Sequence, residues 1–464
     1  MKNRLILSIS LLTLSLILSF YFKPDELTTQ AWNLFIIFFT AILFIILNIL
    51  PIFISSITAI SVALLTNTLT PKQAFGGFSE DFILLIVVAF LIAKGVVNSG
   101  LGKRIAYLMI ERFGKTTLGL SYSVNFIDLL IAPAFPSNTA RSATLFPIVN
   151  SLSIDNNSHA DDSSRKKMGA YLMMSTMASL TLSSALWITA MAANAIGVAI
   201  AKKAGVDISY LSWTIAALPA VIILFFLVPY VIYRVFEPTI KTTPQAKDIA
   251  KEKLRVMGSF SKKEYIMAGV FILLVTLWSL SSLLGINKTA VALLGLSILM
   301  ISKIFTLNDL KSQGSALETL IWFAILYSMS VSLDELGFMS FVASHMANYT
   351  DGLSWFSVYT ILVVGYVFIH YFFVSQSAHM LALYGLFLSV GISSGVDPTL
   401  LALMLLFATN FNAMITPQGS SANIIFLASG YINAKEVYRV GLIVTIINTL
   451  VFMLITTPWI LLIF

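Results

Sequence analysis

The chain has 464 residues, of which 58% are hydrophobic and only 11% are charged, and its mean hydropathy is +0.92. About a quarter of the residues in a soluble globular protein are charged, so this composition excludes that class and indicates a membrane protein. The formal net charge of +7 does not indicate a nucleic-acid partner, because the basic residues lie beside apolar segments and form no basic domain. The absence of cysteine excludes disulfides, thiolate metal sites and a cysteine nucleophile.

The first apolar run, residues 5–21, follows Lys2 and Arg4 as the core of a signal peptide would. It lacks a cleavage site of two small residues, so we expect a retained first transmembrane helix within the segment 1–31. Further apolar runs follow along the chain, several of them close to the roughly 20 residues that a spanning helix needs. They occupy residues 33–52, 54–69, 82–98, 168–200, 213–235, 265–284, 289–304, 317–333, 397–429 and 437–464.

Two other apolar segments are interrupted near their middle and predict re-entrant hairpins rather than spans. The first, residues 118–150, is broken by Pro133, Pro136 and Ser137, and the second, residues 353–393, contains the polar stretch 375–377. With about 11 spanning helices, these hairpins predict an all-α polytopic membrane protein.

Lysine and arginine in short loops set the expected orientation. The most basic loop, residues 237–264, should be cytoplasmic, and its part 239–264 should link the two halves of the chain. The same rule places the N-terminus in the cytoplasm. The amphipathic segment 103–113, with Arg104 on its polar face, should form a helix along the membrane interface, and a loop helix packed on protein is the alternative.

An internal repeat relates residues 32–238 to residues 265–464. The sequence SNTAR at 137–141 lies at the break of the first hairpin, and SQSAH at 375–379 lies at the break of the second. An odd number of crossings in each half would invert one half relative to the other. Inverted repeats place a substrate site at their interface, so we expect the two hairpin tips to face one cavity near the bilayer midplane.

A long helix with a polar interruption follows each hairpin, at 168–200 and 397–429. Asn194 and Asn423 lie at these interruptions, at a separation in sequence close to that between the two tips. Four polar breaks in two matched pairs are therefore predicted to form the functional site.

Broken helices inside a membrane suit a carboxylate ligand, because the N–H groups and the dipole at a helix start attract negative charge. Small hydroxyl and amide side chains donate hydrogen bonds to carboxylate oxygens without adding a fixed charge, and glycine permits an unwound backbone. Alternatively, these side chains only satisfy the backbone of the broken helices. The predicted substrate-binding residues are Ser137, Asn138, Thr139, Arg141, Thr189, Asn194, Ser375, Gln376, Ser377, His379, Thr416 and Gly419.

Arg141 and His379 follow the two tip serines by four positions and lie deep in apolar sequence, where a charge is costly without a counter-charge. We expect the substrate to supply that counter-charge. Alternatively, Arg141 reaches the headgroups and His379 is a neutral packing residue. His370 is as compatible with a hydrogen-bonded core histidine as with the site. Carboxylates near predicted span ends are interpreted as interface or helix-start residues: Glu80, Asp81, Asp128 and Glu318.

The segments around these breaks resemble the divalent anion:sodium symporter family, and within it the citrate:succinate antiporter and plastid dicarboxylate translocator branch. The matching segments are APAFPSNTARSATLFPI (132–148), SSALWITAMAANAI (183–196), HYFFVSQSAHMLALY (370–384) and TPQGSSANIIFLASGYI (416–432). The resemblance implies an elevator-type carrier of C4 to C6 di- and tricarboxylates, with a mobile transport domain and a scaffold domain that holds a homodimer. We expect no cofactor and no metal site, and a prokaryotic plasma membrane as the location.

Sodium-coupled members of that family carry a second SNT motif where this chain has SQSAH. The resemblance therefore implies that Arg141 and His379 replace two sodium ions, and it favours sodium-independent exchange. A sodium-coupled symporter of the same substrates is the main alternative. A channel with polar re-entrant loops is a third possibility, and a membrane enzyme would need a catalytic motif that the sequence lacks.

Overall fold

The computed structural model describes residues 2–161, 163–350 and 352–464, and within those ranges the chain is helical, with one isolated β-bridge between Thr116 and Thr242. In this part of the chain, eight helices are long and apolar enough to cross a membrane. They are Thr29–Ile46, Asp81–Ser99, Thr117–Ala134, Tyr210–Val235, Gly314–Glu335, Trp355–Phe372, Pro398–Ile415 and Ala434–Ile463. Shorter apolar helices cover Ile6–Tyr21, Ile52–Leu65 and Lys288–Ile301. The predicted all-α polytopic membrane protein is confirmed. The side chains of Lys2 and Arg4, on which the expected orientation of the N-terminus depends, lie outside the described residues.

The chain divides into two compact units, and each unit draws on both halves of the sequence. Unit 1 comprises Met1–Val87, Ile196–Asp207 and Gly314–Thr409, and unit 2 comprises Val88–Ala195, Ile208–Gln313 and Asn410–Phe464.

Unit 1 contains helices from the beginning and from the second half of the chain. They are α1 (Lys2–Tyr21), α2 (Thr29–Ile46), α3 (Ile52–Leu65), α4 (Pro71–Ala74), η1 (Gly76–Ser79), the first part of α5 (Asp81–Ser99), the end of α10 (Ala192–Lys203), α17 (Gly314–Glu335), α18 (Phe338–Thr350), α19 (Trp355–Ile369), η4 (His370–Phe372), α20 (Gln376–Ser393) and most of α21 (Pro398–Phe411). Helix α17 packs on α2, α3 and η1. Its Ser328 accepts a hydrogen bond from the Gly77 amide at 2.8 Å, and a Cβ on Gly77 would lie 2.3 Å from the Ala324 carbonyl oxygen. Glycine at this position therefore permits the close packing of η1 on α17.

Unit 2 contains the rest of the chain. Its elements are the remainder of α5, α6 (Leu101–Phe113), α7 (Thr117–Ile131), η2 (Ala132–Ala134), α8 (Asn138–Asp155), α9 (Gly169–Leu186), η3 (Ile188–Ala190), the start of α10, α11 (Tyr210–Val235), α12 (Pro244–Met257), α13 (Lys262–Ser279), α14 (Ser281–Leu284), α15 (Lys288–Ile301), α16 (Leu307–Lys311), η5 (Asn412–Ile415), α22 (Ser421–Ala428), α23 (Ala434–Val451), η6 (Phe452–Thr456) and α24 (Thr457–Ile463).

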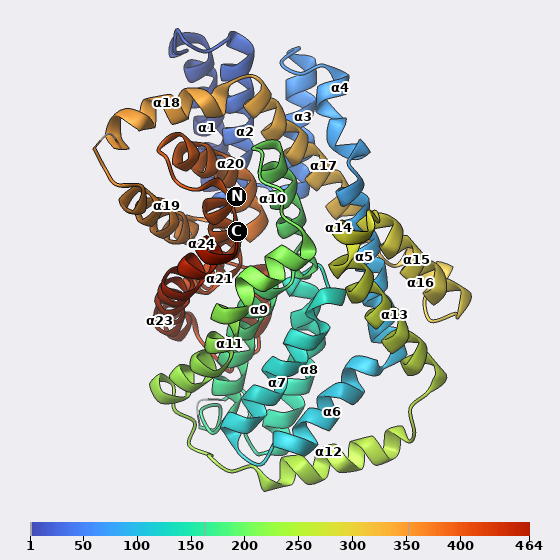
Figure 1. Ribbon diagram of the computed structural model, residues 1–464. Helices are drawn as coiled ribbons and strands as arrows, with labels where there is room; N and C mark the ends of the chain where they lie inside the picture. The colour runs from blue at the N-terminus through green and yellow to red at the C-terminus, as the bar shows by residue number, and fades with distance from the viewer. Residues whose placement is uncertain (1, 162, 351) are drawn as a thin grey trace. The chain divides into compact units, whose positions relative to one another are not determined.

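Helix α9 is the core of unit 2, and every one of its residues is buried. It packs against α7, α8 and α11, and Figure 1 shows α7, α8 and α9 side by side. A helix covered on all sides needs no amphipathic pattern, which explains how serine and threonine occur around its whole circumference. Those hydroxyl groups are consequently available to neighbouring helices rather than to solvent.

The predicted linker 239–264 contains α12, which packs along α6. The Arg104 guanidinium donates to the Glu264 carboxylate at 2.6 Å and to the Gly258 carbonyl at 2.9 Å, and Phe260 lies against it. Burial opposes ionisation of Glu264, but hydrogen bonds from Arg104 and Ser261 outweigh this effect and hold the pKa of the Glu264 carboxyl below its usual range.

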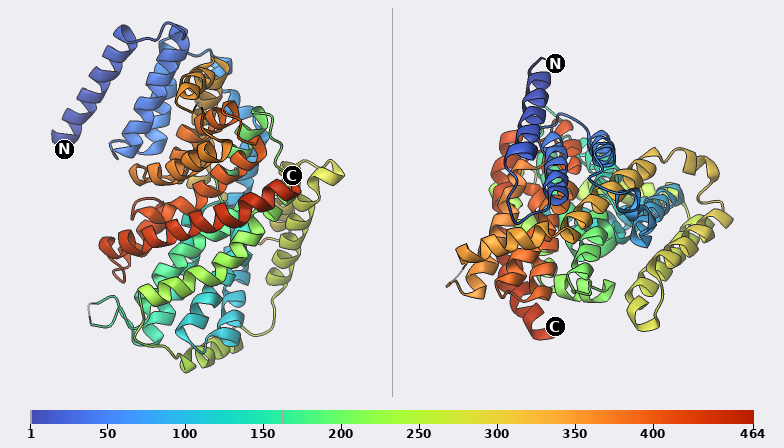
Figure 2. Two further views of the ribbon diagram at one scale, coloured as in Figure 1. Left: turned by 60° about the vertical axis from the view of Figure 1, so that its left-hand side comes forward. Right: turned by 90° about the horizontal axis from the view of Figure 1, so that it is seen from above.

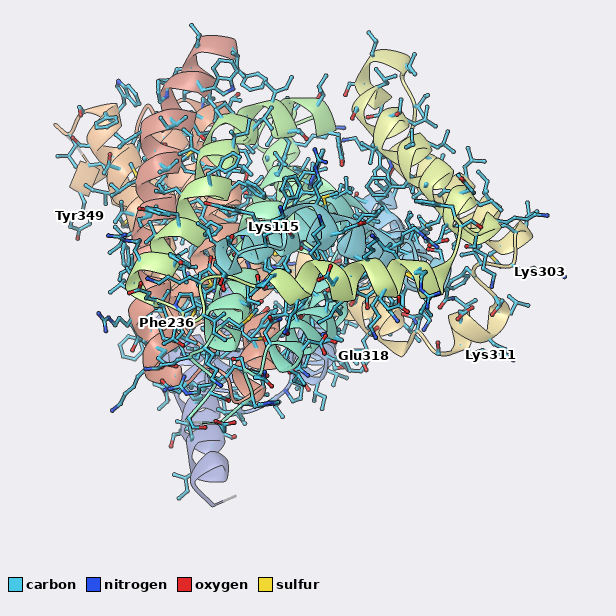
Figure 3. The ribbon with its side chains drawn as sticks, turned by 90° about the horizontal axis from the view of Figure 1, so that it is seen from below. Lys115, Phe236, Lys303, Lys311, Glu318 and Tyr349 are labelled. Carbon is cyan, nitrogen blue, oxygen red and sulfur yellow. The ribbon has the colours of Figure 1, made fainter. Side chains whose placement is uncertain are left out.

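The placement of Arg104 on an outward polar face is therefore wrong, because its side chain is only 5% exposed. The contacts favour the alternative of a helix packed on protein. Figure 3 shows unit 2 from below, with α12 running across it between the region of Phe236 and the turn that carries Lys303.

The chain ends in a long rod made of α23, η6 and α24, which lies beside α11 in Figure 2. Segment η6 is a π-helix, and the Trp459 indole beyond it donates to the Ile215 carbonyl of α11 at 2.9 Å. The rod therefore holds α11 along much of its length.

Candidate functional site

Two helical hairpins have the same local structure. Helix α7 continues through η2 to α8, and α19 continues through η4 to α20, and every bound of the second hairpin follows its counterpart in the first at one constant offset, that between Asn138 and Gln376. The interruptions predicted in 118–150 and 353–393 fall at these turns. The segments Thr117–Ala134 and Trp355–Phe372 are each long and apolar enough to span a bilayer, so the re-entrant placement stays a prediction.

Both hairpin tips place a serine at the start of the second helix. Ser137 has φ −152° and ψ 123°, and Ser375 has φ −149° and ψ 127°, and each hydroxyl oxygen accepts the backbone N–H three residues later at 3.3 Å. This is the helix-capping role that the alternative interpretation anticipated. A capping hydroxyl keeps its own hydrogen, which it can still donate to a ligand.

The two tips show the same pattern of solvent exposure. Ser137, Thr139, Ser375 and Ser377 are at least partly exposed, whereas the amides between them are buried. The hydroxyl-bearing residues are therefore the accessible part of each tip.

The guanidinium of Arg141 is fully buried and makes a network with α7 and α9. Its Nη1 donates to Asp128 at 3.0 Å and also contacts Ser183, and its Nη2 donates to Asn138, to the Ser184 hydroxyl at 2.5 Å and to the Leu180 carbonyl at 3.2 Å. Asp128 also accepts from Ser179 at 2.9 Å and from Ser183 at 2.6 Å. Arg141, Asp128 and Asn138 thus form one network behind the first tip.

Two sequence-based expectations are corrected by this network. The substrate is not the only counter-charge of Arg141, because Asp128 forms a buried ion pair with it. Asp128 itself is not an interface or helix-start carboxylate, since its side chain is 0% exposed and lies in the interior of α7. The antiparallel hairpin arms bring the two residues together across 13 positions of sequence.

At the second tip, His379 pairs with His370. Their Nδ1 atoms are 2.8 Å apart, and the His379 ring lies against Phe373 and Tyr366 at centroid distances of 4.9 and 4.2 Å. One Nδ1 must accept the hydrogen bond, so at most one of the two rings carries a positive charge in this arrangement. The Gln376 amide donates to the Thr409 carbonyl at 2.9 Å, and Tyr366 bonds the Thr409 hydroxyl at 2.8 Å.

Equivalent asparagines form hydrogen bonds across the two helix breaks. Asn194 Nδ2 donates to the carbonyls ten and seven residues earlier, Ser184 and Trp187, at 3.1 and 3.4 Å. Asn423 Nδ2 makes the same pair of hydrogen bonds to Ala413 and Thr416, at 2.7 and 3.1 Å. The Asn194 Oδ1 also accepts from Asn410 at 2.9 Å. Both ends of the Asn194 carboxamide therefore make contacts that hold the break in its shape.

The remaining predicted site residues also lie at the breaks. Thr189 donates to the Pro133 carbonyl at 2.9 Å and so joins η3 to the first tip. Thr416 is 0% exposed, and its hydroxyl has no hydrogen-bond partner among the described residues. A Cβ on Gly419 would lie 2.5 Å from the Ala413 carbonyl oxygen, so this close approach requires glycine.

The first tip and both breaks belong to unit 2, and the second tip belongs to unit 1. Unit 2 brings the first tip and the first break together, since the Ala192 amide donates to the Pro136 carbonyl at 2.9 Å and Ser184 donates to Asn138 at 2.5 Å. That the two tips face a single cavity stays a prediction.

The sequence-based list missed the partners of the two basic side chains. These are Asp128, Ser179, Ser183 and Ser184 around Arg141, and His370 and Tyr366 around His379. A carboxylate inside an apolar helix was a usable signal, because such a residue is expected to have a charged partner nearby.

Comparison with known proteins identifies relatives over nearly the whole chain. The model of the family described as “Sodium:sulfate symporter transmembrane region” matches residues 2–464. The chain is 39% identical over 443 residues to “Dicarboxylate transporter 2, chloroplastic” of Spinacia oleracea, which covers 94% of this chain and 78% of that protein. It is 39% identical over 446 residues to “Putative malate transporter YflS” of Bacillus subtilis (strain 168), with 96% and 93% covered. It is 32% identical over 456 residues to the “Citrate/succinate antiporter” of Escherichia coli (strain K12), with 94% and 93% covered.

A solved transporter structure shares the fold. The Alcanivorax borkumensis YdaH transporter superimposes with a TM-score of 0.56 at 12% sequence identity, covering 84% of this chain and 88% of that chain. At this identity the likeness concerns the fold alone.

Proposed function

Because the chain belongs to the family of the sodium:sulfate symporter transmembrane region, we propose that it is a secondary active transporter that exchanges C4 to C6 di- and tricarboxylates across a membrane. Succinate, malate, 2-oxoglutarate and citrate are the candidate substrates. The names of the relatives, which refer to dicarboxylates, malate and citrate with succinate, support this substrate class. We propose a prokaryotic plasma membrane as the location, with a cytoplasmic N-terminus.

The matched tips are the observation that carries the proposal. Each tip offers a helix N-terminus, partly exposed hydroxyls and a buried basic side chain four residues after the capping serine. Helix N-termini and hydroxyl donors bind carboxylate oxygens, so two such tips suit an anion with a carboxylate at each end. Arg141 Nε has no hydrogen-bond partner among the described residues, and a substrate carboxylate would give this buried donor an acceptor.

The ion pair of Arg141 changes the charge balance that was expected from the sequence. Asp128 neutralises Arg141, and the histidine pair carries at most one positive charge, so these four side chains together carry at most one. A bound dianion would then leave this set with a net negative charge. This observation favours a sodium-coupled symporter as the second candidate, because a sodium ion would restore the balance.

We place sodium-independent exchange first because the second tip has the sequence SQS at 375–377, where sodium-coupled relatives are expected to carry a second SNT motif, and because His379 follows that tip. The relative named as a citrate/succinate antiporter supports the same order. Arg141 and His379 would then bind the substrate directly, with Asp128 holding the guanidinium in position.

We further propose an elevator mechanism in a homodimer, with the two tips facing one substrate cavity. The chain has no cysteine, so spin labels on Thr139→Cys and Ser377→Cys would report the distance between the tips without removal of native thiols. We expect the two labels to be close together. A separation comparable to the bilayer core, about 30 Å, would contradict the shared cavity.

Proteoliposomes test the transport mode directly. Labelled succinate should enter vesicles that contain unlabelled succinate, at the same rate in sodium and in choline buffer, and should not enter empty vesicles. Sodium-dependent entry into empty vesicles would overturn the exchanger and establish the symporter. Current without counter-substrate, at a rate beyond that of a carrier, would indicate a channel.

A further inference from the structure

A row of residues on α23 and at the start of η6 faces the second break, and two of its side chains are polar. What these side chains bind does not depend on the proposed function. Gly441, Thr445, Asn448 and Phe452 follow one another at spacings of four, three and four residues. Such spacings place side chains on one face of a helix. Thr445 and Asn448 are both 0% exposed.

Contacts at both ends of the row show what it faces. A Cβ on Gly441 would lie 1.9 Å from the carbonyl oxygen of Met414, so α23 touches the backbone of η5 at that point. Phe452 stacks on Phe411 with ring centroids 4.9 Å apart, at the other end of η5. Thr445 and Asn448 lie between these contacts, and they therefore face the start of η5 at Asn412.

The polar atoms of this row lack protein partners. The Thr445 hydroxyl and both the Nδ2 and Oδ1 atoms of Asn448 have no hydrogen bond to any described residue. The Thr456 hydroxyl, within the π-helix η6, has none either. Buried polar atoms without partners are rare in folded proteins, and a cluster of them indicates a bound polar species.

We propose that water molecules occupy a buried site between α23 and η5, held by Thr445 and Asn448. The carboxamide of Asn448 decides the chemical class of the ligand. A cation would satisfy Oδ1 and leave Nδ2–H without an acceptor, and an anion would do the reverse. Water accepts from Nδ2 and donates to Oδ1, and it also bonds hydroxyl groups, so it matches every atom of the row.

The first break lacks counterparts of these two polar side chains. At the offset that relates Asn194 to Asn423, the counterparts of Thr445 and Asn448 in the first half are Ala216 and Pro219 of α11, whose side chains have no polar atoms. This pair of polar side chains is therefore specific to the second break. Water can take over a backbone hydrogen bond when a helix end changes shape, so bound water would lower the cost of deforming η5.

Radiolytic hydroxyl-radical labelling of the purified chain, read by mass spectrometry, tests the site. Radicals form from water, and a buried side chain is labelled only where water lies beside it. Met414 is 0% exposed and adjoins the row, and Met267 of α13 is equally buried and serves as the dry reference. We expect Met414 to be labelled clearly faster than Met267 in the wild type. In Thr445→Val/Asn448→Leu, labelling of Met414 should fall to the rate of Met267.

Three outcomes would overturn the proposal. Labelling of Met414 at the rate of Met267 in the wild type means a dry site. Fast labelling that persists in the double variant means water held by other groups. Protection of Met414 that depends on sodium rather than choline means a cation site. Should the double variant fail to fold, Thr445→Val alone should reduce the labelling, and Thr445→Ser, which keeps the hydroxyl, should not.

Discussion

Replacing Asp128 by asparagine would remove the counter-charge of Arg141 while keeping the shape of the side chain. In the wild type, Asp128 accepts from Arg141 at 3.0 Å, from Ser179 at 2.9 Å and from Ser183 at 2.6 Å, and both charged side chains are 0% exposed. Removing one partner of a buried ion pair costs about 3–5 kcal/mol, because the remaining charge is left uncompensated. We expect Asp128→Asn to lower the unfolding temperature in detergent accordingly.

A ligand experiment separates a structural ion pair from a substrate-binding one. If Arg141 binds the substrate, a dicarboxylate restores the missing negative charge in Asp128→Asn. Succinate should therefore raise the unfolding temperature of this variant more than that of the wild type. The shift is measured by thermal unfolding over a series of succinate concentrations.

The chain offers a matched control in the pair Arg104–Glu264, which is buried to a similar degree in unit 2 but lies on α6 and α13 rather than at a tip. Glu264→Gln should destabilise the protein to a comparable extent and leave the succinate shift unchanged. Equal succinate shifts in Asp128→Asn and the wild type would refute the substrate role of Arg141. Wild-type stability of Asp128→Asn would refute the importance of the ion pair.

Three further predictions concern the tips and the second break. Arg141→Lys should slow exchange by about tenfold or more in proteoliposomes, because lysine cannot replace all of the charged hydrogen bonds of the guanidinium, which contribute about 1.5–3 kcal/mol each. An unchanged rate would exclude the guanidinium from the mechanism. His379→Ala should impair exchange without preventing membrane insertion, and His370→Ala should impair it less. Gly441→Ala should cost about 1–3 kcal/mol in the free energy of unfolding, because its Cβ would meet backbone at 1.9 Å. Gly269→Ala, inside α13 and with no heavy atom within 4 Å, should instead stabilise the protein slightly, by up to about 1 kcal/mol.

The positions of the interruptions were predictable from the sequence because their signals are local. Proline and serine in the middle of an apolar run stop a helix and begin another, and Ser137 and Ser375 do cap the helices that follow them. The offset in sequence between the two tips also holds for the helices on both sides of them. A repeated sequence pattern thus indicated a repeated local structure.

The partners of the charged side chains were not predictable in the same way. Asp128 meets Arg141 only because α7 and α8 turn back on one another, and both contact α9. Which residue on one arm faces which residue on the other depends on the geometry of the turn, and the sequence pattern does not contain it. Asn194 was expected at the substrate because it lies at a predicted helix break, whereas its hydrogen bonds hold the break in shape.

The π-helix η6 has a consequence for the end of the chain. One wide turn accommodates an extra residue within the rod, and everything beyond Thr456 is rotated by about 100° relative to an uninterrupted α-helix. The Trp459 indole reaches the Ile215 carbonyl from this rotated position. Deleting a single residue within Phe452–Thr456 would keep the rod helical and its composition almost unchanged, yet it would swing Trp459 away from α11. The direction in which the side chains of the last two helical turns point therefore depends on the number of residues in η6. It does not depend on which side chains those turns carry.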